Sequence, residues 1–117
     1  MPFSDESHPL NQVNSLRRAL HAAGVALWSW RVATDAFVMD EQGFALWGLP
    51  QTDKVTFEDL SSRIHPADRD RVRAAFTATR ALVGAYEIDF RLLLGSDIRW
   101  ISARGLGNDE GLHNGRM

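Results

Sequence analysis

Cysteine is absent from this chain of 117 residues. Its absence excludes disulfide bonds, thiolate metal sites, cysteine nucleophiles and photochemistry that attaches a ligand to a thiol. Long apolar runs are also missing, because no stretch approaches the roughly 18 residues that indicate a membrane-spanning helix. The N-terminal segment carries Asp5 and Glu6 and lacks the pattern of a signal peptide. We therefore expect a soluble protein of the cytoplasm.

Lysine is almost absent, since arginine supplies 12 of the 13 basic residues, and the formal net charge is −2. This balance gives no support for a general electrostatic affinity, so we expect neither nucleic acid nor a membrane among the partners. Hydrophobic residues make up 44% of the chain and charged residues 24%, as in ordinary globular proteins. The length corresponds to one domain with a single core.

The first part of the chain has the pattern of an amphipathic helix. Val13, Leu16 and Leu20 follow one another at spacings of three and four, and Gly24 is a suitable end for the helix. Such a narrow apolar stripe suits either a seam between two helices or docking on a sheet. We assign residues 1–24 to a lead-in and a dimerisation or capping helix, and residues 25–117 to the main domain.

The remaining residues alternate between strand and helix patterns. Strands are expected over 25–32 and 36–39, short helices over 41–47 and after Thr56, and a longer helix from Pro66 to about Val83. Residues 85–94 and 98–106 then alternate apolar with polar side chains, as half-buried strands do. Hairpins joined by one helical crossover predict an α+β domain with an antiparallel sheet.

The end of the chain predicts an incomplete hairpin. Residues 107–117 are rich in Gly, Asn and Asp, and Asn114-Gly115 is a strong turn signal. Only Arg116 and Met117 follow it, which is too few for a returning strand. The pattern therefore predicts that the chain stops just before a further strand.

Five short motifs in this order resemble a PAS domain of the type found in bacterial sensor kinases and cyclic-dinucleotide enzymes. The likeness covers roughly residues 22–117. The motifs are Trp28 and Trp30, Ile64-His65-Pro66 with Asp68-Arg69, the segment Tyr86 to Arg91, Arg99-Trp100-Ile101, and Arg104-Gly105 with Asp109-Glu110-Gly111.

The resemblance implies a PAS-like antiparallel sheet with helices on one face, here truncated before the fifth strand. In the family that strand lies in the middle of the sheet beside the first. An unfilled position there would leave backbone donors and acceptors unpaired. We expect the N-terminal segment, a swapped element or a partner chain to fill it, or the sheet to close with an altered order.

A set of large apolar side chains would line the space between the sheet and the central helices. In the resembled family this space sometimes holds a small molecule. A domain of this size needs most of its large side chains for packing, so a filled core is favoured and a ligand pocket is the alternative. The candidate pocket residues are Met39, Phe44, Trp47, Phe57, Leu60, Ile64, Phe76, Ile88 and Phe90.

A homodimer is expected because the predicted sheet has apolar residues on both faces. The central helices cover one face, and the other needs the N-terminal helix, a second copy of the chain, or both. The candidate interface residues are Val13, Leu16, Leu20, Trp28, Trp30 and Trp100.

Metal, cofactor and catalytic sites are not expected. His65 and Asp68 could share a helix face, but no second pair of ligands stands at a suitable spacing, so a structural role is favoured. In haem-binding members of the resembled family the ligand is typically a histidine of the long helix, and residues 68–83 contain none. The flavin adduct of light-sensing members needs a cysteine, although a flavin held without a covalent bond stays open.

Neither a kinase motif nor a glycine-rich phosphate loop is present, so we expect no enzymatic activity in this chain. A small α+β enzyme would need buried carboxylates facing its pocket, whereas Glu87 and Asp89 alternate to the face opposite Phe90. The resemblance implies a sensory or dimerisation module of a bacterial signal-transduction protein, such as a sensor histidine kinase. The alternative is a sensor that binds a small molecule or cofactor in its core.

Overall fold

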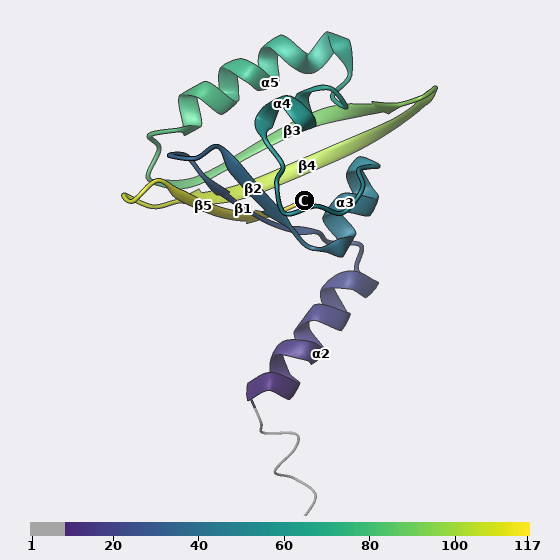
Figure 1. The fold of residues 1–117 in the computed structure, drawn as a ribbon, viewed down its shortest axis with the longest axis vertical. Coiled ribbons are helices and arrows are strands. Elements are labelled where there is room, and N and C mark those ends of the chain that lie inside the picture. The colour runs from purple at the N-terminus through teal and green to yellow at the C-terminus, as the bar shows by residue number, and fades with distance from the viewer. Residues whose placement is uncertain (1–8) are drawn as a thin grey trace, which may run out of the picture.

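A computed structural model describes residues 9–117 of the chain, and its elements are shown in Figure 1. In chain order the elements are α2 (Pro9–Ala22), β1 (Leu27–Arg31), β2 (Ala36–Met39), α3 (Glu41–Trp47), α4 (Phe57–Ser61), α5 (Pro66–Thr79), β3 (Gly84–Leu94), β4 (Asp97–Gly107) and β5 (Leu112–Arg116). The fold class is α+β, as the sequence predicts. The long helix α5 ends at Thr79, four residues before the predicted end.

The five strands form one antiparallel sheet in the order β2-β1-β5-β4-β3. Helices α3, α4 and α5 lie on one face of this sheet, which we call the inner face (Figure 1). The opposite, outer face has no helix packed on it among the described residues. Helix α2 projects from the body of the molecule.

The prediction of a missing fifth strand is wrong. Strand β5 lies in the centre of the sheet and pairs with both neighbours, with Trp30 opposite His113 and Gly105 opposite Gly115. The turn before it is formed by residues 108–111, where the Asn108 side chain accepts hydrogen bonds from the backbone N–H groups of Glu110 and Leu112. The central position expected to be empty is therefore filled by this chain's own β5.

The turn signal at Asn114-Gly115 has a different physical cause. A Cβ atom at Gly115 would overlap the Arg104 carbonyl oxygen and the Trp28 ring. The glycine is therefore required by close packing inside the strand. A left-handed turn residue is supplied instead by Gly111, whose φ is +75°.

The start of α5 is fixed to the sheet by Asp68. Its carboxylate accepts hydrogen bonds from the backbone N–H of Arg91 at 2.9 Å and from the Arg91 guanidinium at 3.0 and 2.8 Å. Hydrogen bonds from Arg91 hold the pKa of the Asp68 carboxyl well below its usual range. The neighbouring His65 caps the helix by accepting from the Ala67 N–H, so both residues have the structural roles that the sequence favours.

The alternation predicted for the two long strands is confirmed by their register. Phe90 pairs with Ile101 and both are buried on the inner face, whereas Arg91 pairs with Trp100 on the outer face. Inner-face residues of β1, β2, β3 and β4 then pack with the helices around one core. This layering places the largest side chains between the sheet and α3, α4 and α5.

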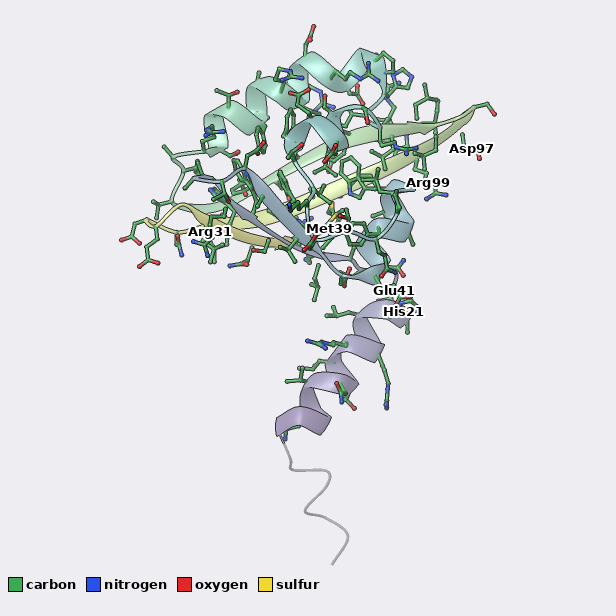
Figure 2. All side chains as sticks on the ribbon, viewed as in Figure 1. His21, Arg31, Met39, Glu41, Asp97 and Arg99 are labelled. Carbon is green, nitrogen blue, oxygen red and sulfur yellow. The ribbon has the colours of Figure 1, made fainter. Side chains whose placement is uncertain are left out.

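Helix α2 stands clear of that core. Figure 2 shows its side chains surrounding the projecting helix, with His21 at the end nearest the body. Val13 is 44% exposed and Leu16 is 64% exposed, so the predicted stripe is largely uncovered. Within residues 9–117 no helix is long and apolar enough to span a membrane.

Candidate functional site: a cavity under helix α5

A cavity of about 360 Å³ lies between the inner face of the sheet and the helices. Its volume is within the range of small-molecule sites, at the lower end. Eight of the nine predicted pocket residues line it, and only Phe44 does not. The lining residues are Trp28, Trp30, Phe37, Met39, Trp47, Phe57, Leu60, Ile64, Arg71, Val72, Ala75, Phe76, Thr79, Tyr86, Glu87, Ile88, Phe90, Ala103 and Met117.

The cavity opens between α5 and β3. Lining residues on its far side, such as Trp30 and Ile64, are buried, whereas Phe76 of α5 and Ile88 of β3 are only half-buried although they face inward. Inward-facing residues retain exposure because the space between the helix and the edge strand is not filled by side chains. A molecule entering the cavity would therefore pass between these two elements.

Two glycines on neighbouring strands lie beneath two of the rings that line the cavity. Gly105 and Gly115 pair across β4 and β5, and the Trp28 and Tyr86 rings lie directly against them. A Cβ atom at Gly105 would be 2.6 Å from the Tyr86 ring and 2.9 Å from the Trp28 ring. Because the glycines have no side chains, both rings can approach the sheet closely.

The polar part of the site is a pair formed by Tyr86 and His113. The Tyr86 hydroxyl and the His113 Nδ1 are 2.8 Å apart, and the His113 side chain is fully buried against the Trp30 ring. Burial raises the pKa of Tyr86 to about 12. Burial also lowers the pKa of His113, partly offset by the Arg80 backbone, so the imidazole is neutral at pH 7.

The buried indole Nε1 of Trp28 lacks a hydrogen-bond partner among the described residues. The other two core tryptophans are paired, since Trp30 donates to Asp35 at 3.3 Å and Trp47 donates to the Met117 sulfur at 3.3 Å. Buried unpaired donors are uncommon and costly in folded proteins.

Two charged residues, Arg71 and Glu87, are among the lining, and the side chain of each lies near a charged partner outside the cavity. Arg71 lies 3.7 Å from Asp68, and Glu87 lies 3.4 Å from Arg104. The interior therefore presents apolar surface with very few polar atoms.

Met117 joins the cavity to the beginning of the sheet. Its side chain lines the cavity and accepts a hydrogen bond from Trp47. Its backbone exchanges two hydrogen bonds with Ala26, at 3.0 and 2.9 Å. Ala26 lies just after the turn at Gly24 that follows α2. Met117 therefore contacts both the cavity and the backbone segment that joins α2 to β1.

The predicted dimer-interface residues are divided between the two faces. Trp28 and Trp30 lie on the inner face, where they line the cavity, so their assignment to an outer interface is wrong. The sequence of β1 has apolar residues on both sides, so it does not indicate which face of the sheet the two tryptophans occupy. Trp100 is 70% exposed on the outer face, and Val13 and Leu16 are exposed on α2.

Sequence reasoning did not assign several lining residues to the pocket, among them Val72, Tyr86 and Met117. Tyr86 alternates with Ile88 and Phe90, so the strand pattern already placed it on the inner face. Met117 follows strand β5, which the sequence analysis considered absent. Groups of three or more potential metal ligands are not found among the described residues.

Comparisons with known proteins agree with this architecture. The sequence profile of the family described as PAS fold matches residues 36–113. The chain is 34% identical over 94 residues to the non-motile and phage-resistance protein of Caulobacter vibrioides, covering 78% of this chain and 11% of that protein. It is 30% identical over 96 residues to the sensor protein FixL of Bradyrhizobium diazoefficiens, covering 80% of this chain and 19% of that protein.

A solved structure shows the same fold. The sensory box histidine kinase/response regulator from Burkholderia thailandensis superimposes with a TM-score of 0.64 at 29% identity, covering 87% of this chain and 82% of that chain. The chain spans only about a tenth and a fifth of the two curated relatives, which are much longer proteins.

Proposed function

This chain belongs to the PAS family of sensory domains, and we propose that it acts as the sensory module of a bacterial signal-transduction protein such as a sensor histidine kinase. The module would report the occupancy of its cavity by changing the packing of helices at its ends. Catalytic output would come from residues outside this chain, and we assign the module to the cytoplasm. A linked signalling domain is supported by the greater length of the relatives.

The observation that carries this proposal is the position of Met117. An occupant of the cavity would touch the Met117 side chain, whose backbone is paired with Ala26 next to the end of α2. A shift of this pairing would also shift α2, because Val25, next to Ala26, donates its backbone N–H to the Leu20 carbonyl in the last turn of the helix. Binding can change the position of α2 only if the occupant binds more tightly when α2 is in one position than when it is in another.

Native mass spectrometry of the protein as purified tests the sensing role. We expect extra mass per chain that is released on denaturation, because the cavity can hold a small molecule. The parent protein supplies the second test, in which Met117→Ala should alter the signal output while the module stays folded. An output that does not change when the whole module is deleted would contradict the proposal.

We further propose that the module forms a homodimer through α2 and the outer face. The supporting observation is uncovered apolar surface at Val13, Leu16, Val38, Ile98 and Trp100, of which Trp100 is 70% exposed. Exposed apolar surface of this kind is typical of protein interfaces. Leu20 is half-buried and completes the stripe on α2.

Charge reversal of the stripe tests the dimer. Leu16→Glu and Leu20→Glu should convert a dimer mass into a monomer mass while the circular dichroism spectrum of the domain is kept. Ser15→Glu is the matched control, because Ser15 is exposed on the opposite side of the same helix. A dimer that survives both leucine substitutions would rule out α2 as its interface.

A further inference from the structure

Both edges of the sheet are partly covered by other segments of the chain. At the β2 edge, the backbone N–H of Phe37 donates to the Val55 carbonyl at 2.8 Å. At the β3 edge, residues 63–65 pair with Arg91 and Leu93 in backbone hydrogen bonds of 2.8 and 2.9 Å. The chain then continues into α5, which leaves the first half of β3 without a neighbouring strand on this side.

The first half of β3 presents backbone groups at this edge. The paired residues of the second half direct their N–H and carbonyl groups away from β4, and every second residue of a strand shares that direction. Ala85, Glu87 and Asp89 therefore also direct theirs outward, where these groups have no backbone partner among the described residues. All three residues are exposed. We call residues 85–89 the free edge.

Two carboxylates accompany the backbone groups of the free edge. Asp89 forms none of the salt bridges of the described residues, and the Glu87 side chain is 65% exposed although it lies 3.4 Å from Arg104. An antiparallel second copy of β3 centred on Ile88 would place Glu87 opposite Asp89, and like charges in directly opposite positions repel. The free edge therefore disfavours pairing with itself and with other acidic strands.

The same register specifies the side chains of an acceptable strand. Residues opposite Glu87 and Asp89 would place their side chains on the outer side, beside the two carboxylates. The residue between them would lie opposite Ile88, which is half-buried and faces inward. Basic side chains at the first two positions and an apolar side chain between them complement this edge. Leu82 and Val83 add apolar surface just before β3, since they are 36% and 68% exposed.

We propose that the free edge binds an extended segment of a partner protein, in which basic residues alternate with apolar ones, as a sixth strand of the sheet. The backbone hydrogen bonds supply the affinity of such strand addition, and the two carboxylates supply the selection for basic segments. The proposal goes beyond the sensing function, because it requires neither an occupied cavity nor a dimer.

Capped pentapeptides test the proposal. Acetyl-Lys-Val-Lys-Val-Thr-amide can place its two lysines opposite Asp89 and Glu87, and acetyl-Glu-Val-Glu-Val-Thr-amide is the control of reversed charge. A third peptide repeats the lysine sequence with N-methyl groups on both lysines, which removes the N–H groups that face the free edge. Titrations of the intact chain at low salt, followed by ¹H–¹⁵N correlation spectra, measure the dissociation constants.

The lysine peptide should shift the amide signals of Ala85, Glu87 and Asp89 downfield. It should bind about tenfold more tightly than the glutamate peptide, because two cross-strand charge pairs change from attractive to repulsive. The N-methylated peptide should lose the downfield shifts and most of the binding. Equal binding of the lysine and glutamate peptides would overturn the selection for basic segments, and equal binding of the N-methylated peptide would overturn strand addition. If none of the peptides binds, the whole proposal fails.

Proline at the free edge separates the backbone contribution from the charge. Glu87→Pro removes an outward N–H and leaves the hydrogen bonds to β4 in place, whereas Glu87→Ala removes only the carboxylate. The lysine peptide should bind the proline variant about three- to tenfold more weakly than the alanine variant, as for one lost hydrogen bond. If the proline variant does not fold, the N-methylated peptide decides the same question.

Charge reversal on the protein completes the test. Asp89→Lys should bring the affinities of the lysine and glutamate peptides close together. Asp109→Lys is the matched control, because it changes the net charge equally at an exposed position of the turn between β4 and β5. The control should keep the preference for the lysine peptide. A preference lost equally in both variants would show a general charge effect and overturn the assignment to the free edge.

Discussion

The two faces of the sheet contain similar side chains in opposite environments. Trp30 on the inner face is 1% exposed, whereas Trp100 on the outer face is 70% exposed, although both lie on strands of the same sheet. Phe37 stacks on Trp30, and Ile98 lies on the same face of β4 as Trp100. The alternation of side chains along a strand determines on which face a residue lies, whereas the helices packed on that face determine whether the residue is buried.

Replacing these two tryptophans gives the largest predicted contrast. Trp30→Ala should lower the free energy of unfolding by about 3–5 kcal/mol, because it removes a buried ring from the core. Trp100→Ala should cost less than about 1 kcal/mol, mainly the cation–π contact with the Arg91 guanidinium, 5.6 Å from the ring. Urea unfolding curves of the two variants measure the difference. Equal costs would mean that the outer face is covered in solution.

A methyl group at Gly105 tests how tightly the inner face is packed beneath the Tyr86 and Trp28 rings. Gly105→Ala should cost about 1–3 kcal/mol, because the Cβ atom meets the Tyr86 and Trp28 rings. The displaced Tyr86 ring should also lose its hydrogen bond to His113. In a Tyr86→Ala background the same substitution should cost clearly less, as measured by a double-mutant cycle. Additive costs would place the tyrosine away from the glycine.

Titration of the single tyrosine gives the smallest but most specific effect. Burial raises the pKa of Tyr86 to about 12, so the folded state holds the phenol proton more tightly than the unfolded state. The resulting stabilisation is present below about pH 10 and is lost as the pH rises towards about 12. Absorbance at the tyrosinate band should show little ionisation near pH 11 in the folded protein and extensive ionisation in urea. A folded-state midpoint near 10 would contradict burial of the ring.

Much of the fold could be predicted because its signals are local. The alternation of β3 and β4, the cap at Thr56 and the proline at the start of α5 depend on neighbouring residues, and the structure has them where the sequence indicates. The identity of β5 depends instead on backbone pairing with β1 and β4, which are distant in sequence. Asn114 and Gly115 therefore read as a turn, although they lie inside a central strand.

The candidate site was only partly predictable for a similar reason. The alternation identified which side chains face inward, and eight of the nine predicted residues line the cavity. Whether such side chains fill their space depends on packing between α5 and the sheet, which a pattern of residue types does not contain. Sequence reasoning favoured a filled core, and the structure has a cavity of about 360 Å³ instead.

Arg91 links the two faces around the edge of the sheet. Its guanidinium anchors Asp68 at the start of α5 on one side and lies over the Trp100 ring on the other. Any surface that covers Trp100 also withdraws this guanidinium from water, and the attraction between opposite charges is stronger where water is excluded. Contact on the outer face should therefore strengthen the attachment of α5, the helix that borders the mouth of the cavity.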